Sequence, residues 1–348
     1  MRAILIIAIL CMSVGLFGAW ADFSYYKSHV ISSATGSGTN YQVMITVHYG
    51  TGTDSGDDVY LNSNTQTDFD DVAFFDNDQS TQLDCWLQEK TDSDNAIFWV
   101  EVADDLSSSA VTIYVLYGDA DGTSQSDGVS TFIFFDDFDD GSLSSSTWDD
   151  TTYGTISGGV LIVEGDPARG TLYSVPSLSC NNGLSIMSYM KIGDSVMDRC
   201  GIWKLYYDIN NQTNYYSQTG YSGKITIVSK DGGVQPATSP YDATFTVGAY
   251  KLLESNYESD YWDTKWDGSS VNTFTTYVTD YSTYAPQLVL SKGADNGDYM
   301  YFDWVAIRQF VSTEPAHSTW GTETSTVTAI IIDQINGFDV SDIEFYVP

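Results

Sequence analysis

Short segments that alternate apolar and more polar residues recur along this chain, and they constrain its fold more than any other feature. The clearest is Tyr41–Tyr49, in which Tyr41, Val43, Ile45 and Val47 are apolar. Because successive side chains of a β-strand point to opposite faces, this alternation predicts a strand with one buried face. The other strand candidates are 96–102, 111–117, 159–164, 184–191, 202–207, 224–229, 271–278 and 299–310. Since no segment has a convincing helical period, we predict an all-β fold of two consecutive antiparallel β-sandwiches.

Turn-forming residues indicate where one sandwich ends and the next begins. Residues 119–130 are rich in Gly, Ser and Asp and precede a Phe-rich strand, so the boundary is placed near residue 130. The first sandwich is expected over residues 22–130 and the second over residues 131–321. Residues 322–348 are too short to bury a core of their own. They are expected to be a tail with a terminal strand, or the start of a further domain.

The N-terminus has the pattern of an export signal. Arg2 is followed by an apolar run over residues 4–17 and by Ala19-Trp20-Ala21, a small-x-small cleavage pattern, so residues 1–21 are expected to be a signal peptide. The run is shorter than the roughly 20 residues of a membrane span, and no later segment is long and apolar enough. We therefore expect a secreted or cell-surface protein whose mature form does not span the membrane. A lipoprotein attached at Cys11 is the alternative, which the bulky Leu10 disfavours.

Three cysteines remain after the signal peptide. Cys180 and Cys200 flank a predicted strand, and a disulfide between them would add roughly 3 kcal/mol of stability. Cys85 is then left over. We interpret it as a small buried hydrophobe beside Trp86, with pairing between molecules as the alternative.

The charge balance excludes one class of partner. The 348 residues include 47 acidic and 13 basic side chains, a net charge of −34. Binding to nucleic acid needs a basic surface, so nucleic acid is excluded. Many acidic residues are expected in exposed turns, where Asp accepts hydrogen bonds from backbone amides. A more specific use of some of them is calcium binding through oxygen ligands.

Two strands carry carboxylates among residues that favour burial. They are 134–138, with Asp136 and Asp137, and 301–308, with Asp303. A carboxylate beside an apolar core is costly unless it is hydrogen-bonded, paired or bound to a metal. Crowded acids such as Asp136, Asp137, Asp139 and Asp140 also repel one another unless a cation or water screens them. These strands therefore indicate a defined polar site.

The first half of the chain resembles a known secreted family. The resemblance is carried by residues 26–31, 34–43, 68–72, 98–102 and 113–118, which include Asp68-Phe69-Asp70-Asp71-Val72 and Phe98-Trp99-Val100-Glu101-Val102. These residues are similar to the family called domain of unknown function 2341, whose members are exported, multidomain surface proteins. The family has no assigned activity, so the resemblance implies an architecture and no specific function.

The second half resembles a concanavalin A-like, laminin G-type lectin or glucanase domain. The similarity rests on the two Asp-bearing strands, which would open and close a jelly roll. In such sandwiches a calcium ion commonly joins the first strand to the last. The resemblance therefore implies a structural calcium ion held by Asp136 or Asp137 together with Asp303. In the alternative, Asp303 caps backbone amides or pairs with Arg308.

Catalytic motifs are not found in the sequence. Laminarinase-like enzymes of this fold carry Glu-x-Asp-x-x-Glu on one strand, and the chain has no such motif. His-Glu-x-x-His and Gly-x-Ser-x-Gly are also missing. We therefore expect that the protein is not an enzyme, with a polysaccharide-degrading activity as a weaker alternative.

An aromatic cluster suggests a binding site instead. Tyr257, Tyr261, Trp262 and Trp266 lie in an acidic, polar stretch, and exposed aromatic rings beside carboxylates often bind sugars in sandwich domains. The alternative is core packing, with Trp266 beneath a hairpin turn formed by Asp267-Gly268. The sequence thus predicts an adhesive surface protein that binds carbohydrate or another cell-surface polymer. The alternative is a structural envelope or filament subunit without a small ligand.

Overall fold

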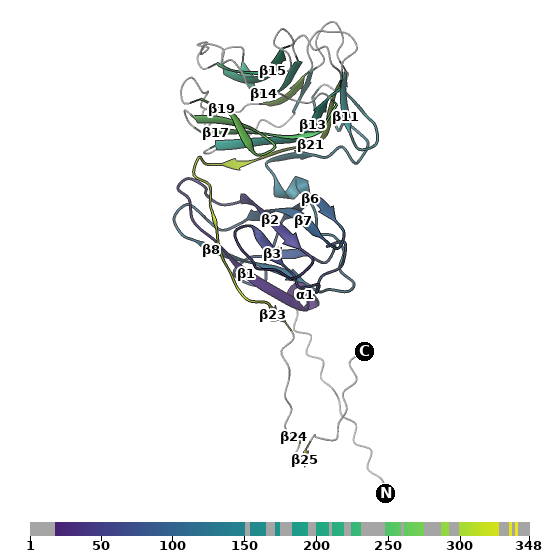
Figure 1. Cartoon of the computed structure of the whole chain (residues 1–348), viewed down its shortest axis with the longest axis vertical. Helices are drawn as coiled ribbons and strands as arrows, with labels where there is room; N and C mark the ends of the chain where they lie inside the picture. The colour runs from purple at the N-terminus through teal and green to yellow at the C-terminus, as the bar shows by residue number, and fades with distance from the viewer. Residues whose placement is uncertain are drawn as a thin grey trace.

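The fold is almost entirely β-structure, as the sequence predicted. A computed structural model describes residues 18–149, 154–164, 171–174, 183–193, 200–208, 211–218, 224–230, 248–258, 261–274, 287–291, 299–326, 334–335 and 338–339. Within these ranges the helices are α1 (Gly18–Asp22) and α2 (Gly128–Thr131). Neither has the length and hydrophobicity of a membrane-spanning helix. Two β-sandwiches lie one beyond the other along the long axis (Figure 1).

The first sandwich contains two facing sheets. One has the strand order β22-β1-β8-β4-β5, with β23 also paired to β1, and the other has the order β3-β2-β7-β6. The strands are β1 (Tyr25–Ile31), β2 (Tyr41–His48), β3 (Asp58–Tyr60), β4 (Ala73–Phe75), β5 (Gln82–Leu83), β6 (Cys85–Thr91), β7 (Asn95–Val102), β8 (Val111–Tyr117), β22 (His317–Trp320) and β23 (Thr324–Ser325). Alternation in β2 sends Val43, Ile45 and Val47 into the shared core, as the sequence pattern predicted.

The chain returns to the first sandwich after it leaves the second. We expected the second sandwich to continue to residue 321, but β22 pairs antiparallel with β1, with Trp320 opposite His29. β23 extends this pairing, with Ser325 opposite Tyr25. These two strands cover the edge of β1 that β8 leaves open. The alternation of apolar and polar residues in a short strand does not predict which sheet edge that strand will join.

The second sandwich also consists of two sheets, in the arrangement of a concanavalin A-like jelly roll. The larger sheet has the order β10-β11-β21-β13-β17-β18-β19, with β9 paired to β21, and the smaller has the order β12-β20-β14-β15-β16. The larger sheet comprises β9 (Phe134–Asp136), β10 (Gly154–Ile156), β11 (Leu161–Glu164), β13 (Gly183–Ile192), β17 (Lys251–Glu258), β18 (Tyr261–Trp266), β19 (Ser269–Phe274) and β21 (Tyr299–Phe310). The smaller comprises β12 (Thr171–Tyr173), β14 (Cys200–Asp208), β15 (Asn211–Gln218), β16 (Lys224–Lys230) and β20 (Gln287–Ser291). The first and last strands of this sandwich, β9 and β21, are neighbours, as the resemblance implied.

Beyond β23, a small hairpin is described. It consists of β24 (Gln334–Ile335) and β25 (Phe338–Asp339), which pair with each other.

A third apolar cluster joins the two sandwiches. It consists of Trp86, Trp99, Phe132, Phe135, Met187, Trp304 and Ala306, which come from β6, β7, the α2 region, β9, β13 and β21. Gly128 of α2 packs so closely that a Cβ at this position would lie 2.3 Å from the ring of Phe135. The outer face of the β2-β7-β6 part of one sheet therefore packs on the outer face of the larger sheet of the second sandwich.

Candidate binding groove

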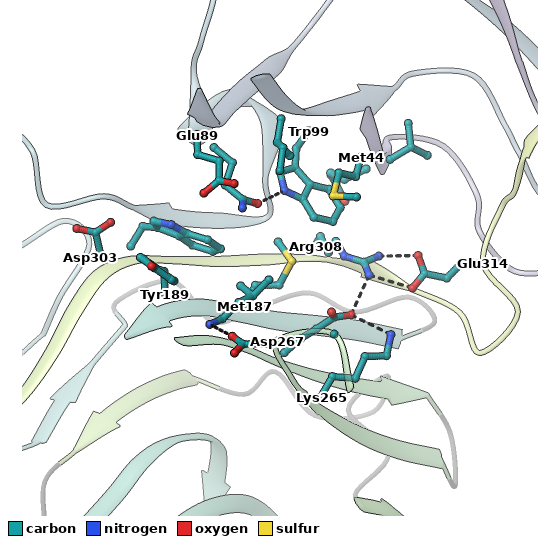
Figure 2. Close-up of a pocket in the computed structure, with 18 of the residues that line it drawn as sticks. Met44, Glu89, Trp99, Met187, Tyr189, Lys265, Asp267, Asp303, Arg308 and Glu314 are labelled. Atoms are coloured by element: carbon teal, nitrogen blue, oxygen red, sulfur yellow. Dashed lines mark hydrogen bonds and ion pairs between the residues drawn. The ribbon is translucent and has the colours of Figure 1, made fainter. Parts of the chain in front are cut away.

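An open groove of about 800 Å³ runs along this junction. Figure 2 shows β21 crossing it, with Glu89, Trp99 and Met44 of the first sandwich on one side and Met187, Tyr189, Lys265 and Asp267 of the second on the other. Pockets of this size at domain interfaces, with apolar walls and a few placed polar groups, are the usual form of small-molecule sites.

The wall from the first sandwich is formed by residues that alternation turns away from the core. Met44 on β2 and Ile97 and Trp99 on β7 line the groove, whereas their neighbours Val43 and Phe98 contribute to the core of the first sandwich. The Trp99 indole N–H donates to Gln88 Oε1 at 2.8 Å. This hydrogen bond fixes the ring, which is only 9% exposed.

The wall from the second sandwich follows from the register of its strands. Tyr189 on β13 lies opposite Trp304 on β21 and opposite Leu252 on β17, so these side chains share the outer face of the sheet. Met187 lies in the next row, opposite Ala306. Tyr189 is 38% exposed, which is high among the aromatic side chains that the structure describes. It gives the groove an accessible aromatic surface.

One end of the groove is closed by an ion-pair network. The Arg308 guanidinium donates to Glu314 Oε1 at 2.9 Å and to Glu254 Oε1 at 3.3 Å, and Lys265 pairs with the same Glu254 at 3.5 Å. Arg308 is 3% exposed and lies 5.2 Å from the centre of the Trp99 ring. Burial opposes its charge, but Glu314 and Glu254 raise the pKa of Arg308 above its ordinary value. The charges at this end are therefore compensated.

The other end is acidic. Glu89 is exposed, Asp303 is half-buried, and both line the groove. Burial raises the pKa of Asp303, and the nearby Asp139 and Asp137 raise it further. Carboxylate oxygens at this end accept hydrogen bonds, and the amide of Gln88 adds both a donor and an acceptor.

The acidic residues expected to hold an ion lie on or beside the paired strands β9 and β21. Asp136 lies opposite Val305, and its carboxylate accepts hydrogen bonds from the Phe138 amide at 2.9 Å and the Trp148 indole at 2.7 Å. Burial raises the pKa of Asp136. Asp137 acts electrostatically on Asp303. Within the described ranges, no group of three or more acidic, His or Cys side chains is close enough to hold a metal ion.

The predicted aromatic cluster does not assemble on one surface. Tyr257 is 3% exposed and belongs to the core of the second sandwich, and Trp266 packs against that core from its edge. Alternation in β17 and β18 turns both inward, so Tyr257 is out of reach of a ligand. Tyr261 stacks on Phe310 at 6.2 Å, and the side chain of Trp262 lies outside the described part of the structure. Asp267 and Gly268 form the turn between β18 and β19, as expected.

The cysteines are described only in part. Cys85 is a free, buried thiol, in agreement with its interpretation as a small hydrophobe, and burial raises its pKa to about 12. Cys180 and the side chain of Cys200 lie outside the described residues.

The sequence singled out some groove residues for other roles, such as Asp303 for an ion and Arg308 as its alternative partner, but it identified none of them as lining a groove. Trp99 and Trp304 were quoted only for a resemblance, and Met187 and Tyr189 only as part of predicted strands. Each lies at an outward position of a strand whose neighbours are core residues. The alternation of residues can identify an aromatic side chain that points away from the core of its own sandwich. It cannot identify which two outer faces pack against each other.

Comparisons with known proteins match parts of the chain. The family described as Domain of unknown function (DUF2341) matches residues 68–151, which is less than half of the chain. The match runs from the loop before β4 into the start of the second sandwich, and it excludes the segments at residues 26–43 that also resembled the family. No curated protein sequence matches the chain.

Several solved structures share the fold of about half of the chain. An endo-acting O-glycanase of the human gut microbiota superposes with a TM-score of 0.43 at 12% identity, over 52% of this chain and 100% of that one. A β-1,3-1,4-glucanase from a mouse hindgut metagenome has a TM-score of 0.42 at 13% identity, over 51% and 99%. An endo-β-1,3-glucanase from Pyrococcus furiosus has a TM-score of 0.42 at 12% identity, over 52% and 95%.

These structures correct one expectation. From the missing Glu-x-Asp-x-x-Glu motif we expected that the protein is not an enzyme, yet the structures that share its fold are glycanases and glucanases. The missing motif therefore does not exclude catalysis. At 12–13% identity over half of the chain, the fold is shared and no activity is transferred.

Proposed function

We propose that this protein binds carbohydrate in the groove between its two sandwiches. The observation that carries the proposal is the open groove of about 800 Å³ whose lining includes the exposed Tyr189 ring on one side and the amide of Gln88 and the carboxylate of Glu89 on the other. A sugar ring presents an apolar C–H face and an edge of hydroxyls. An aromatic ring packs against the apolar face, and fixed carboxylates and amides form hydrogen bonds with the hydroxyls.

The charge distribution of the groove favours a neutral, hydroxyl-rich ligand. Arg308 and Lys265 are paired with Glu254 and Glu314, so they offer no uncompensated positive charge. Glu89 and Asp303 lie at the open end and accept hydrogen bonds. With a net charge of −34, the molecule also repels polyanions at long range.

Calcium and export belong to the same proposal. We propose that Asp303, with Asp137 or Asp136, holds a structural calcium ion beside the groove, supported by the pairing of β9 with β21 and by the proximity of Asp137 and Asp139 to Asp303, whose pKa they raise. Residues 1–21 are proposed to direct export, which would place the groove outside the cell or on its surface. A role in adhesion would follow from binding a surface polymer there.

Binding is tested on an array of plant, fungal and mucin glycans, followed by titration of the strongest soluble binder. We expect Tyr189→Ala to weaken affinity about tenfold, because it removes the exposed aromatic surface. Glu89→Gln should weaken it less, since one acceptor oxygen remains. Tyr261→Ala is the matched control: it removes a tyrosine from β18, two strands away from β13 in the larger sheet.

Two results would count against the groove. If Tyr261→Ala weakens binding and Tyr189→Ala does not, the site lies elsewhere. If no glycan binds at millimolar calcium, a structural envelope subunit becomes the better description. Release of reducing ends from the same polymers, measured in parallel, reports any hydrolysis.

The calcium site is tested by thermal unfolding. We expect calcium to raise the Tm relative to chelator, because an ion that binds only the folded state stabilises it. Asp303→Ala should abolish most of this increase, and Asp121→Asn, at an exposed acidic residue of the first sandwich, should keep it. An equal Tm in calcium and chelator would contradict the site.

A further inference from the structure

A strip of tyrosines continues the groove along the outer face of the second sandwich. It consists of Tyr189, Tyr250, Tyr301 and Tyr299, with Lys191 between two of them. Tyr189 lines the groove and also begins the strip. The strip therefore starts where the acidic end of the groove opens.

The register of three strands places these residues in adjacent rows. Lys191 on β13 lies opposite Tyr301 on β21, and Met190 lies opposite Lys251, the residue that follows Tyr250. The row beside it contains Tyr189, opposite Trp304. Consecutive rows on one face of a sheet give a continuous surface.

The rings are held in fixed positions. Tyr250 stacks on Tyr189 with centroids 5.2 Å apart and an interplanar angle of 24°, and Tyr299 lies 6.4 Å from Tyr301. A Cβ on Gly193 would come within 2.8 Å of the Tyr301 ring, so glycine at this position lets the ring lie against the strand. Burial and the nearby Asp303 raise the pKa of Tyr250 to about 12, which keeps its hydroxyl protonated and able to donate.

Lys191 differs from the other lysines and the arginine whose side chains the structure describes. Five of the cations whose side chains the structure describes have a carboxylate partner: Lys27, Lys90, Lys251, Lys265 and Arg308. Within the described part of the chain, Lys191 has no such ion pair. Its ammonium lies 4.8 Å from the centre of the Tyr250 ring and 4.4 Å from that of Tyr301. Held there by cation–π attraction, it keeps N–H donors for a ligand.

We propose that this strip is a second saccharide subsite, so that the ligand is an oligosaccharide chain that crosses from the groove onto the outer face of β13 and β21. The inference rests on the proposed function and extends the ligand from a single sugar to an oligosaccharide chain. Tyr301 and Tyr250 offer ring faces to the sugar rings, and Lys191 and the phenol hydroxyls bond to their hydroxyl groups.

The chemistry of the strip indicates which class of ligand binds there. A protein partner would need a larger apolar surface than these half-buried, hydroxyl-bearing rings provide. An oligosaccharide matches both the aromatic surface and the donors. It is also long enough to bridge two sites that share Tyr189, and linked subsites bind a single chain more tightly than either alone.

The proposal is tested with laminari-oligosaccharides and xylo-oligosaccharides of increasing length, by calorimetric titration of the full chain. We expect affinity to rise with length until both sites are filled. The double variant Tyr250→Ala/Tyr301→Ala should weaken binding of the long chains about tenfold or more and leave a disaccharide unaffected. Lys191→Gln should weaken long chains less. Tyr261→Ala serves as the control for loss of a tyrosine, and circular dichroism verifies that each variant is folded.

The outcomes separate the two proposals. If binding depends on Tyr189 but affinity is independent of length and of Tyr250 and Tyr301, the second subsite is wrong and the groove stands. If long chains bind and only the strip variants weaken them, the strip is the site and the groove proposal fails. If neither oligosaccharide series binds at any length and no glycan on the array does, both are overturned.

Discussion

At the residue scale, the guanidinium of one arginine, Arg308, contacts three parts of the molecule. Arg308 lies on β21 of the second sandwich, stacks over Trp99 of the first, and pairs with Glu314 on the connection that leads to β22. The sequence suggested Asp303 as its alternative partner. Five residues along one strand separate their backbones by about 16 Å, which is too far for an ion pair. Glu314 and Glu254, which lies on β17 two strands away from β21, take that place.

Removal of Arg308 is therefore expected to be costly. Arg308→Ala leaves Glu254 and Glu314 without their buried partner, and we expect a loss of about 3–5 kcal/mol in the free energy of unfolding. The measurement is urea unfolding followed by tryptophan fluorescence. Lys265→Ala, which removes the more exposed partner of Glu254, should cost about 1 kcal/mol or less. Equal losses for the two variants would show that the network does not depend on Arg308.

At the element scale, β22 is held against β1 by two histidines. His29 Nε2 lies 2.8 Å from His317 Nδ1, and the His29 ring stacks on Trp320 at 3.6 Å. Burial and the neighbouring His317 lower the pKa of His29 to about 3. Burial also lowers the pKa of His317, although Asp57 opposes that shift. The pair thus holds β22 in place only while His29 is neutral.

This pairing predicts a loss of stability in acid. The unfolded chain takes up a proton on His29 near pH 6.5, whereas the folded protein does so only near pH 3, so the unfolded state binds more protons between these values. Stability contributed by neutral His29 is therefore fully present above about pH 6.5 and is lost as the pH falls towards 3. Hydrogen exchange of residues 317–326 should accelerate over this range, before the core of the second sandwich is exposed.

His29→Phe provides the comparison. Phenylalanine keeps a ring against Trp320 but cannot be protonated, so the acid dependence of exchange in β22 should become shallower. Similar profiles in the variant and the original protein would assign the acid sensitivity to carboxylates instead.

The strands and turns were easier to predict from the sequence than the contacts that they make with other parts of the chain. The alternation at residues 41–49 identified β2 and its buried face, and Asp267-Gly268 identified the turn between β18 and β19. Both signals are local, because they depend only on neighbouring residues in the chain. The sequence did not reveal that Tyr257 faces inward, since that depends on which strands flank β17. Nor did it reveal that Tyr189 faces the first sandwich.

At the scale of the whole molecule, the junction of the two sandwiches is a core in its own right. Trp86 stacks edge-on against Phe135 and Trp304 at 4.8 and 5.1 Å, and Gln42 donates to Thr131 O at 2.9 Å while it accepts from the Gln309 amide at 3.0 Å. Such a junction fixes the two walls of the groove relative to each other. These contacts join residues far apart in the sequence, so no local pattern could predict them.

The junction should make the two sandwiches unfold together. Trp86→Ala is expected to cost about 3–5 kcal/mol, as large-to-small substitutions in a core do, and to split one thermal transition into two. Differential scanning calorimetry would measure both effects. Val129→Ala, at a residue that is 73% exposed, is the control and should leave the transition unchanged. A single transition of unchanged midpoint in Trp86→Ala would mean that the sandwiches are not coupled through this cluster.

The pairing of β1 with β23 has a mechanical consequence. Tyr25 and Ser325 are paired neighbours, so the strands that lead into and out of the body of the protein lie side by side in the first sandwich, at the end remote from the second (Figure 1). Tension applied to the chain through these two residues would separate β1 from β23 and load the first sandwich alone. The second sandwich and the groove would bear none of it until that pairing opened.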